Sequence, residues 1–270
     1  MTNPTGDKDP RITGRENGLT NGARAGIFLI RTGPLAGLPD IVWCDVPAGK
    51  FVYADNSSPE IAEPYRIAKY PVTNSQFLSF IQDPSGYANA KWWAGLNDAA
   101  GVQQLAGPAD AMWPDADRPR EMVSWYEAMA FCEWLSHRLG YKVSLPTEEQ
   151  WEKAARGPAG STYPYGSRFD DYKSNTSESR FGHTTAVDLY RDGVSPYGAL
   201  GMSGNVWEWT LSEYHSRRND NLSSDNPRVL RGGSWANSRH YAKAASRICN
   251  YPGDRFVNAG FRLMSPASNP

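Results

Sequence analysis

Three helix-capping boxes restrict where this chain can form regular helices. At Thr73, Ser124 and Thr147 a hydroxyl residue is followed three positions later by Gln or Glu, and an apolar run comes next. In such a box the two side chains bond backbone N–H groups that a helix start leaves unpaired. The spacing predicts one helix after each box, the second ending at Gly140 and the third covering about residues 148–156.

Short strands are expected elsewhere. Apolar runs bounded by Gly and Pro predict strands at residues 27–30, 41–46 and 51–53. Beyond Gly157 the chain is rich in Gly, Ser, Asn, Asp and aromatic residues, which indicates irregular loops holding short strands. Trp207 and Trp209 alternate with polar residues, as on a half-buried strand. The predicted fold class is therefore α+β, irregular, with short strands and about three helices.

The composition favours one domain. Residues 1–25 offer little apolar surface to offset the entropy of ordering, so they are predicted to be a disordered polar tail. Residues 26–264 are predicted to form a single domain, because ten Trp and fourteen Tyr supply ample core material. Within it, residues 86–120, which include Trp92 and Trp93, are expected to form an insertion loop.

Several partner classes are not expected. The net charge is −1 and no long Lys/Arg run is present, which argues against nucleic acid. No apolar run approaches a membrane span, and the first residues lack the order of a signal peptide, so a cytoplasmic location is the default expectation. Cys44, Cys132 and Cys249 lie far apart, which indicates neither a disulfide framework nor a zinc site.

Four ordered motifs carry a resemblance to a known family. They are YPVTNSQF at residues 70–77, VSWYEAMAFCEWL at 123–135 leading to LPTEEQWEKAARG at 145–157, GNVWEWT at 204–210, and RVLRGGSW at 228–235 closing with GFRL at 260–263. Over about residues 42–264 the chain resembles the formylglycine-generating-enzyme (sulfatase-modifying factor) family. The resemblance implies that family's irregular variant of the C-type lectin fold.

The resemblance also implies where catalytic groups would stand. Members that oxidise a sulfatase cysteine carry a copper-binding thiol pair just after the Gly-Gly-Ser, and these positions hold Asn237 and Ala242 here. Neither an amide nor a methyl group can replace a thiolate as a ligand for Cu(I). The sulfoxide-synthase branch binds iron through a histidine cluster that this sequence lacks. We therefore expect no catalytic residue and no catalysis, with a non-heme metal oxidase or oxygenase as the alternative.

A structural calcium ion is a further implication of the resemblance. The family often binds calcium around the motif that corresponds to residues 205–208, where Asn205 and Glu208 are the candidate oxygen ligands. Calcium needs six or more oxygens, and only these two can be named. The alternative is that both residues cap a turn and pair with an arginine. No other cofactor is expected.

The C-terminal segment, residues 228–264, has an unusual pattern. Between Trp235 and Gly260 five residues form a fixed-looking frame: Arg239, Ser246, Arg247, Pro252 and Arg255. Twelve others, here called the variable positions, follow no helical or strand period: Ala236, Asn237, Ser238, His240, Tyr241, Ile248, Asn250, Tyr251, Asp254, Phe256, Val257 and Asn258. All twelve residues, and also Cys249, can be encoded by codons that differ from an Asn codon only in the first two bases.

That pattern resembles the variable region of proteins diversified by diversity-generating retroelements, which mutate adenines copied from a template. The resemblance implies a recognition protein whose ligand, macromolecular or small, is unknown. Rigid aromatic side chains mixed with adaptable polar ones are also typical of antibody loops. We expect the variable positions to form one exposed patch, because buried positions could not vary freely.

Overall fold

The computed structural model describes residues 37–54 and 56–268. The expected tail at residues 1–25 and strand at 27–30 lie outside this range. The helices are α2 (Asn74–Gln82), α3 (Asp98–Ala106), α4 (Trp125–Leu139) and α5 (Glu148–Arg156), with 3-10 turns η2 (Ala90–Trp93), η3 (Ser177–Ser179) and η4 (Arg191–Gly193). The strands are β1 (Trp43–Val46), β2 (Gly49–Lys50), β3 (Glu60–Ile61), β4 (Tyr65–Ala68), β5 (Trp207–Glu213), β6 (Arg228–Arg231), β7 (Arg247–Asn250), β8 (Ala259–Phe261) and β9 (Met264–Pro266).

The three capping boxes are confirmed. Thr73, Ser124 and Thr147 each accept a hydrogen bond from the backbone N–H three residues on, and the Gln or Glu at that position bonds back to the cap. Gly140 ends α4 in the left-handed conformation, which glycine adopts without a Cβ clash.

The prediction of an insertion loop at residues 86–120 needs correction. It contains η2 and α3, and Trp92 and Trp93 lie in the main hydrophobic core at 5% exposure each. Asn97 caps α3 by accepting from the N–H of Ala100. Because Ala stands where a capping box has Gln or Glu, half of the usual signal is missing from the sequence.

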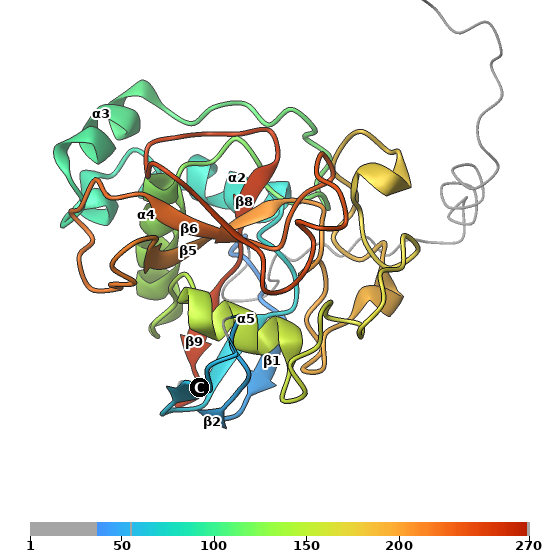
Figure 1. The fold of residues 1–270 in the computed structure, drawn as a ribbon. Coiled ribbons are helices and arrows are strands. Elements are labelled where there is room, and N and C mark those ends of the chain that lie inside the picture. The colour runs from blue at the N-terminus through green and yellow to red at the C-terminus, as the bar shows by residue number, and fades with distance from the viewer. Residues whose placement is uncertain (1–36, 55, 269–270) are drawn as a thin grey trace, which may run out of the picture.

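Beside the short antiparallel pair of β2 and β3, two larger sheets contain the other strands (Figure 1). One has the order β1-β4-β9, and the other has the order β7-β6-β5-β8, in which β5 and β8 run parallel. The strand expected at residues 41–46 begins at Trp43, whereas residues 51–53 form no strand, although Phe51 and Tyr53 are buried.

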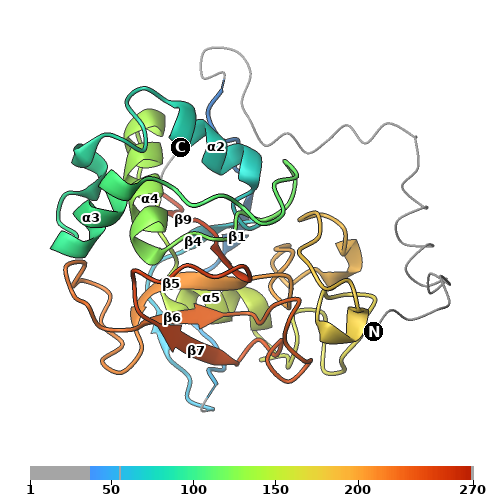
Figure 2. The same cartoon turned by 90° about the horizontal axis from the view of Figure 1, so that it is seen from above.

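Strand β5 is buried on both faces and not half-buried as its pattern indicated. Glu208 points toward Trp151 of α5, and Trp209 on the opposite face packs among α4 residues, so the two helices cover opposite sides of the strand (Figure 2). The polar residue that suggested a solvent face belongs instead to a buried ion pair with Arg262.

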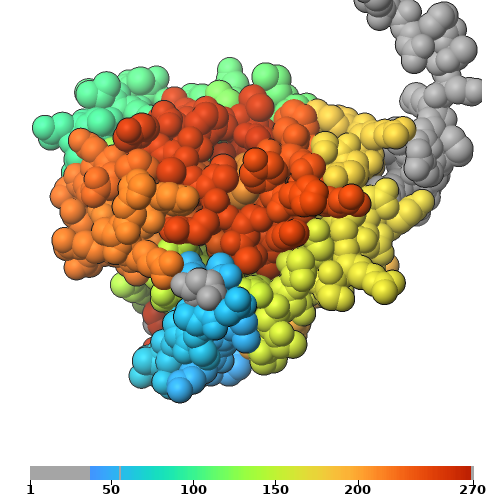
Figure 3. All heavy atoms as spheres, viewed as in Figure 1, coloured from blue at the N-terminus to red at the C-terminus, as the bar shows by residue number. Residues whose placement is uncertain are grey.

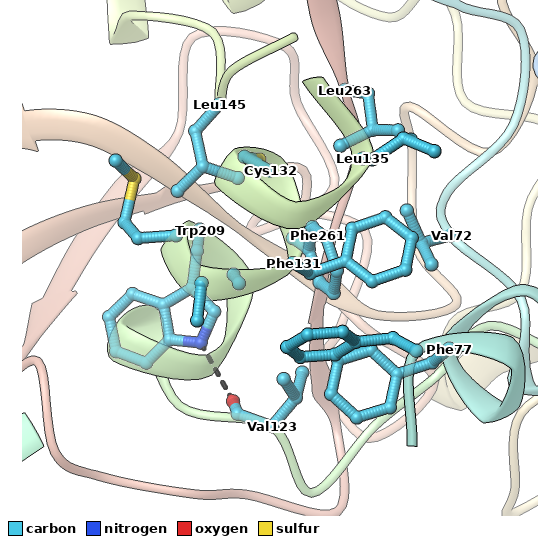
Figure 4. Packing of buried hydrophobic residues seen from close by; sticks show 14 of the residues in the cluster. Val72, Phe77, Val123, Phe131, Cys132, Leu135, Leu145, Trp209, Phe261 and Leu263 are labelled. Atoms are coloured by element: carbon cyan, nitrogen blue, oxygen red, sulfur yellow. Dashed lines mark hydrogen bonds between the residues drawn. The ribbon is translucent and has the colours of Figure 1, made fainter. Parts of the chain in front are cut away.

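Aromatic side chains fill the main core (Figure 4). Phe131 stacks on Phe77 at 5.7 Å between ring centroids and meets Phe261 edge-on at 5.5 Å. Trp209 Nε1 donates to the carbonyl of Val123 at 3.0 Å, so its one polar group is satisfied inside the core. Within the described residues, no helix is long and apolar enough to cross a membrane.

Candidate ligand-binding surface

The C-terminal segment lies across one face of the molecule. Strand β6 lies between β5 and β7, with Arg231 opposite Arg247, and β8 joins the other edge of β5. The segment thus leaves the sheet and returns to it, and its loops are carried on strands. Figure 3 shows its orange-to-red atoms spread over the middle of one face, with green residues above and yellow residues beside them.

None of the variable positions is buried. Tyr241 and Tyr251 are 49% and 63% exposed, and Ala236 and His240 are also exposed. The others are half-buried: Asn237, Ser238, Ile248, Asn250, Asp254, Phe256, Val257 and Asn258. Ligand binding by these side chains stays a prediction.

The frame residues are anchored to helix starts. Arg255 makes a two-pronged contact with Glu127 of α4, both distances being 2.9 Å. Arg247 pairs with Glu148 of α5 at 2.9 Å and lies over the Tyr214 ring. The two parallel N–H···O bonds of Arg255 fix its guanidinium in both position and plane. Arg247 makes one hydrogen bond to Glu148, from Nη2 at 3.1 Å.

Two further arginines of the segment are paired with buried glutamates. Arg231 contacts Glu152 of α5, and Arg262 pairs with Glu208 of β5 at 2.5 Å. All four glutamates, Glu127, Glu148, Glu152 and Glu208, are buried. The segment is therefore fixed by side chains that are not among the variable positions.

Pro252 and Arg239 contribute to the frame through their backbone, and Ser246 contributes through its hydroxyl group. Buried Pro252 accepts the N–H of Trp125 at the start of α4, and Ser246 donates to the carbonyl of His240. The Arg239 side chain is exposed, which differs from its expected role as a fixed side chain, but its N–H donates to Glu178. Burial opposes ionisation of Glu178, yet that N–H and neighbouring donors outweigh it and lower the pKa of the carboxyl.

A glycine turn brings two parts of the segment together. Gly233 has φ +76°, and a Cβ there would lie 2.8 Å from the Tyr241 carbonyl oxygen. Only glycine fits this close approach of two backbones. Ser234, the next residue, donates to Asn237 Oδ1 at 2.6 Å and accepts from Asn258 Nδ2 at 3.0 Å. Asn237 and Asn258 thus contact the fixed turn, unlike most variable positions.

The positions assigned to the missing thiol pair differ in burial. Asn237 is half-buried and accepts from Trp207 Nε1 at 2.8 Å, whereas Ala242 is fully buried. Their correspondence to the catalytic cysteines stays a prediction. Burial raises the pKa of the Cys44 and Cys132 thiols, which disfavours their reactive thiolate forms. None of the three cysteines forms a disulfide.

The calcium candidates Asn205 and Glu208 are engaged by protein donors. Asn205 Oδ1 accepts from Asn175 Nδ2 and from the N–H of Thr185, at 3.1 and 2.9 Å. The Glu208 carboxylate accepts from Trp151 Nε1 and from the Arg262 guanidinium. This arrangement matches the turn-and-arginine alternative. Calcium binding stays an untested prediction, and it would require these contacts to be exchanged.

Other metal ligands do not converge in the described part of the chain. No group of three His, Cys, Asp or Glu side chains lies where it could hold a metal ion there. His137 packs against Trp92 and His183 against Trp113, while His240 is exposed on the loop.

Two fixed neighbours of the surface were missed from the sequence. Trp113 meets Trp235, the residue before the first variable position, at 5.2 Å. Gln103 of α3 donates to the carbonyl of Gly253. Both belong to the stretch taken for an insertion loop, and no local pattern indicates which distant segment such a stretch will contact.

Comparisons with solved structures define the fold. The chain is similar to Treponema denticola variable protein 1, with a TM-score of 0.63, 22% identity, and coverage of 84% of this chain and 95% of that chain. It is also similar to CarF, with a TM-score of 0.65, 21% identity, and coverage of 84% and 99%. The fold is thus the C-type-lectin-like fold of the formylglycine-generating-enzyme type.

Sequence comparisons give relatives that include an inactive enzyme and an oxygenase. "Inactive C-alpha-formylglycine-generating enzyme 2" of Bos taurus is 31% identical over 251 residues, which covers 77% of this chain and 79% of that protein. "Hercynine oxygenase" of Mycobacterium tuberculosis is 33% identical over 234 residues, 74% of this chain but only 52% of that protein. The family model for the sulfatase-modifying factor enzyme 1-like domain matches residues 33–267. The chain therefore belongs to the sulfatase-modifying factor family.

Proposed function

We propose that this protein is a recognition module whose segment 228–264 is a ligand-binding surface diversified by a retroelement, and that it catalyses no reaction. The single observation that carries the proposal is that the anchoring residues of the segment and its variable positions are different residues. The anchoring contacts come from fixed arginines and from Pro252, while none of the variable positions is buried. Such a surface can change its side chains and keep its backbone.

The chemistry of the surface suits varied ligands. Tyr241 and Tyr251 present large rigid areas at a low cost in side-chain entropy, and His240 and Asp254 add hydrogen-bonding groups. The ligand is an unidentified macromolecule or small molecule at this face, and neither nucleic acid nor a membrane is proposed.

Some of the relatives are compatible with a protein that does no chemistry. One similar structure is named a variable protein, and the mammalian relatives are named inactive enzymes. We infer that Asn237 and Ala242 stand where enzymes of the family have their catalytic thiols, which removes the copper site.

Two display libraries of the full chain test the proposal. One randomises the four exposed variable positions Ala236, His240, Tyr241 and Tyr251, and the other randomises the four anchoring arginines Arg231, Arg247, Arg255 and Arg262. Most members of the first library should resist protease as the parent does, and most of the second should not. An equal loss of protease resistance in the two libraries would refute this separation of anchoring residues from variable positions.

Recognition is tested with the same display format. A library randomised at all the variable positions should yield clones that bind a chosen protein, such as hen lysozyme, and reversion of the variable positions to the parent residues should abolish the binding. If repeated selection yields only clones with changes outside segment 228–264, this segment is not a recognition surface.

The alternative, a non-heme metal oxidase or oxygenase, is favoured by the similarity to the hercynine oxygenase. This chain matches about half of that relative's length, so its activity cannot be transferred whole. Metal analysis of the purified protein, followed by oxygen-consumption assays with thiol substrates, tests this alternative. Stoichiometric iron or copper with turnover would establish it.

A further inference from the structure

A cavity separate from the variable positions lies between α2 and the connection from α3 to α4. Its volume is about 360 Å³. Leu78 and Ile81 of α2 form one wall, and Pro108, Ala111 and Pro114 form another. Figure 2 shows α2 beside the green connection that supplies the second wall. A cavity of this size with mainly apolar walls is typical of small-molecule sites.

The cavity also contains a buried cation. Arg120 lines it and is 6% exposed. Its Nη2 donates to the carbonyl of Ala109, its guanidinium lies 4.9 Å from the Phe77 ring centroid, and its Nε has no hydrogen-bond partner. Within the described residues no ion pair joins Arg120 to a carboxylate.

The acids near Arg120 bond to other groups or are exposed. Glu127 accepts hydrogen bonds from Nε and Nη2 of Arg255 and from the Tyr87 hydroxyl. Glu121 accepts the N–H of Trp113 at 3.1 Å, and burial raises the pKa of this carboxyl against the backbone donors and Arg120, which lower it. Asp110, which also lines the cavity, is exposed. Glu127 and Glu121 act on Arg120 only through space, and its buried Nε has no hydrogen-bond partner. An anion in the cavity that bonds the guanidinium directly would therefore stabilise the protein.

The walls of the cavity are held in place without a ligand. Asn74 Nδ2 donates to the carbonyls of Trp113 and Asp115 at 2.8 and 3.0 Å, which ties the connection to α2. The site therefore needs little ordering on binding, a cost that would otherwise reduce affinity.

We propose that this cavity binds a small apolar monocarboxylate, whose hydrocarbon body contacts Leu78, Ile81 and the prolines and whose carboxylate pairs with Arg120. Charge complementarity selects the head group, and the apolar walls select the body. The site is independent of the diversified surface, although Trp113 joins the two regions by contacting Trp235.

Calorimetric titration of the full chain with octanoate, and with octan-1-ol as the uncharged counterpart, tests the proposal. Octanoate should bind one site per chain and more tightly than octan-1-ol. Arg120→Gln should weaken octanoate binding by about tenfold or more and leave octan-1-ol unchanged, as expected for the loss of a charge-assisted hydrogen bond. Arg168→Gln, which removes an exposed arginine, is the matched control and should change neither.

A second variant covers the case in which Arg120→Gln does not fold. Leu78, which is 46% exposed, lines the cavity without touching the charge, so Leu78→Trp should narrow the cavity and weaken both ligands. Equal affinity of the parent protein for octanoate and octan-1-ol would overturn the proposal, as would unchanged octanoate binding in either variant. Tighter binding of a peptide ending in a free Leu carboxylate would assign the cavity to a protein partner instead.

Discussion

At the scale of single residues, buried glutamates connect the early part of the chain to the C-terminal segment. Glu127 shows this best, because it completes the capping box of α4 and also binds Arg255. Helix starts favour negative charge, so the same carboxylates that stabilise α4 and α5 also offer partners for arginines. The arginines could be predicted as frame residues from the sequence, but their partners lie 99 to 128 positions away and no spacing rule identifies them.

Glu208→Gln should destabilise the protein strongly. It leaves the fully buried Arg262 without its counter-ion, which costs about 3–5 kcal/mol in the free energy of unfolding. Urea unfolding measures the effect. The exposed pair of Asp220 and Arg218 provides the control, since Asp220→Asn should leave the urea midpoint where it is. A Glu208→Gln protein as stable as the parent would contradict the assigned ion pair.

Asp83 should contribute a pH-dependent part of the stability. Burial opposes its ionisation, but hydrogen bonds from Trp134 Nε1 and the Ser85 N–H, with Arg138 nearby, lower the pKa of this carboxyl. The stability it contributes is complete above the unfolded-state pKa of about 4 and is lost as the pH falls through the lower folded-state pKa. Urea titrations should show a gap between parent and Asp83→Asn at neutral pH that closes in acid. A gap that widens in acid would show the opposite shift.

At the scale of elements, local signals were sufficient where the stabilising contacts are local. The helices that follow capping boxes start where the sequence predicts, because the box places both partners within four residues. Strand limits were less predictable. Residues 51–53 have strand-like composition, yet strand formation needs a distant pairing partner that composition does not specify.

The glycine turn before the variable positions can be tested against a matched glycine. Gly233 and Gly140 have similar φ angles, +76° and +74°, but only at Gly233 would a Cβ meet backbone atoms at 2.8 Å. Gly140→Ala should cost about 1 kcal/mol for its backbone conformation alone. Gly233→Ala should cost at least about 1 kcal/mol more, because two backbone segments must move apart. Thermal unfolding of both variants compares them directly, and equal losses would contradict the close approach.

At the scale of the whole molecule, the ion pairs that hold the C-terminal segment come from residues outside the variable positions. Residues far apart in sequence, in α4, α5 and β5, hold the C-terminal segment, and the resemblance to a family was needed to predict that fold. No periodicity indicated a parallel pairing of β5 with β8 or the cover of helices on both faces of β5. The variable positions are predicted from the codon pattern and the frame; four of them are exposed and eight are half-buried.

The separation of anchoring residues from variable positions predicts unequal costs within one loop. Arg255→Ala leaves the buried Glu127 without its guanidinium and should cost about 3–5 kcal/mol. Tyr251→Ala, four residues earlier, removes an exposed ring and should change the free energy of unfolding by less than about 0.5 kcal/mol. Chemical denaturation of the two variants gives the comparison, and a larger loss for Tyr251→Ala would place that ring in the fold and not on the recognition surface.

The most direct test of diversification is the DNA sequence beside the gene. We predict a near-copy of the segment that encodes residues 228–264, together with a reverse-transcriptase gene, and we predict that the copy differs from the gene almost only where the copy carries adenine. The differing codons should be those of the variable positions. A locus with no such copy, or a copy whose differences fall equally on all four bases and on the codons for Arg247 and Arg255, would contradict the account.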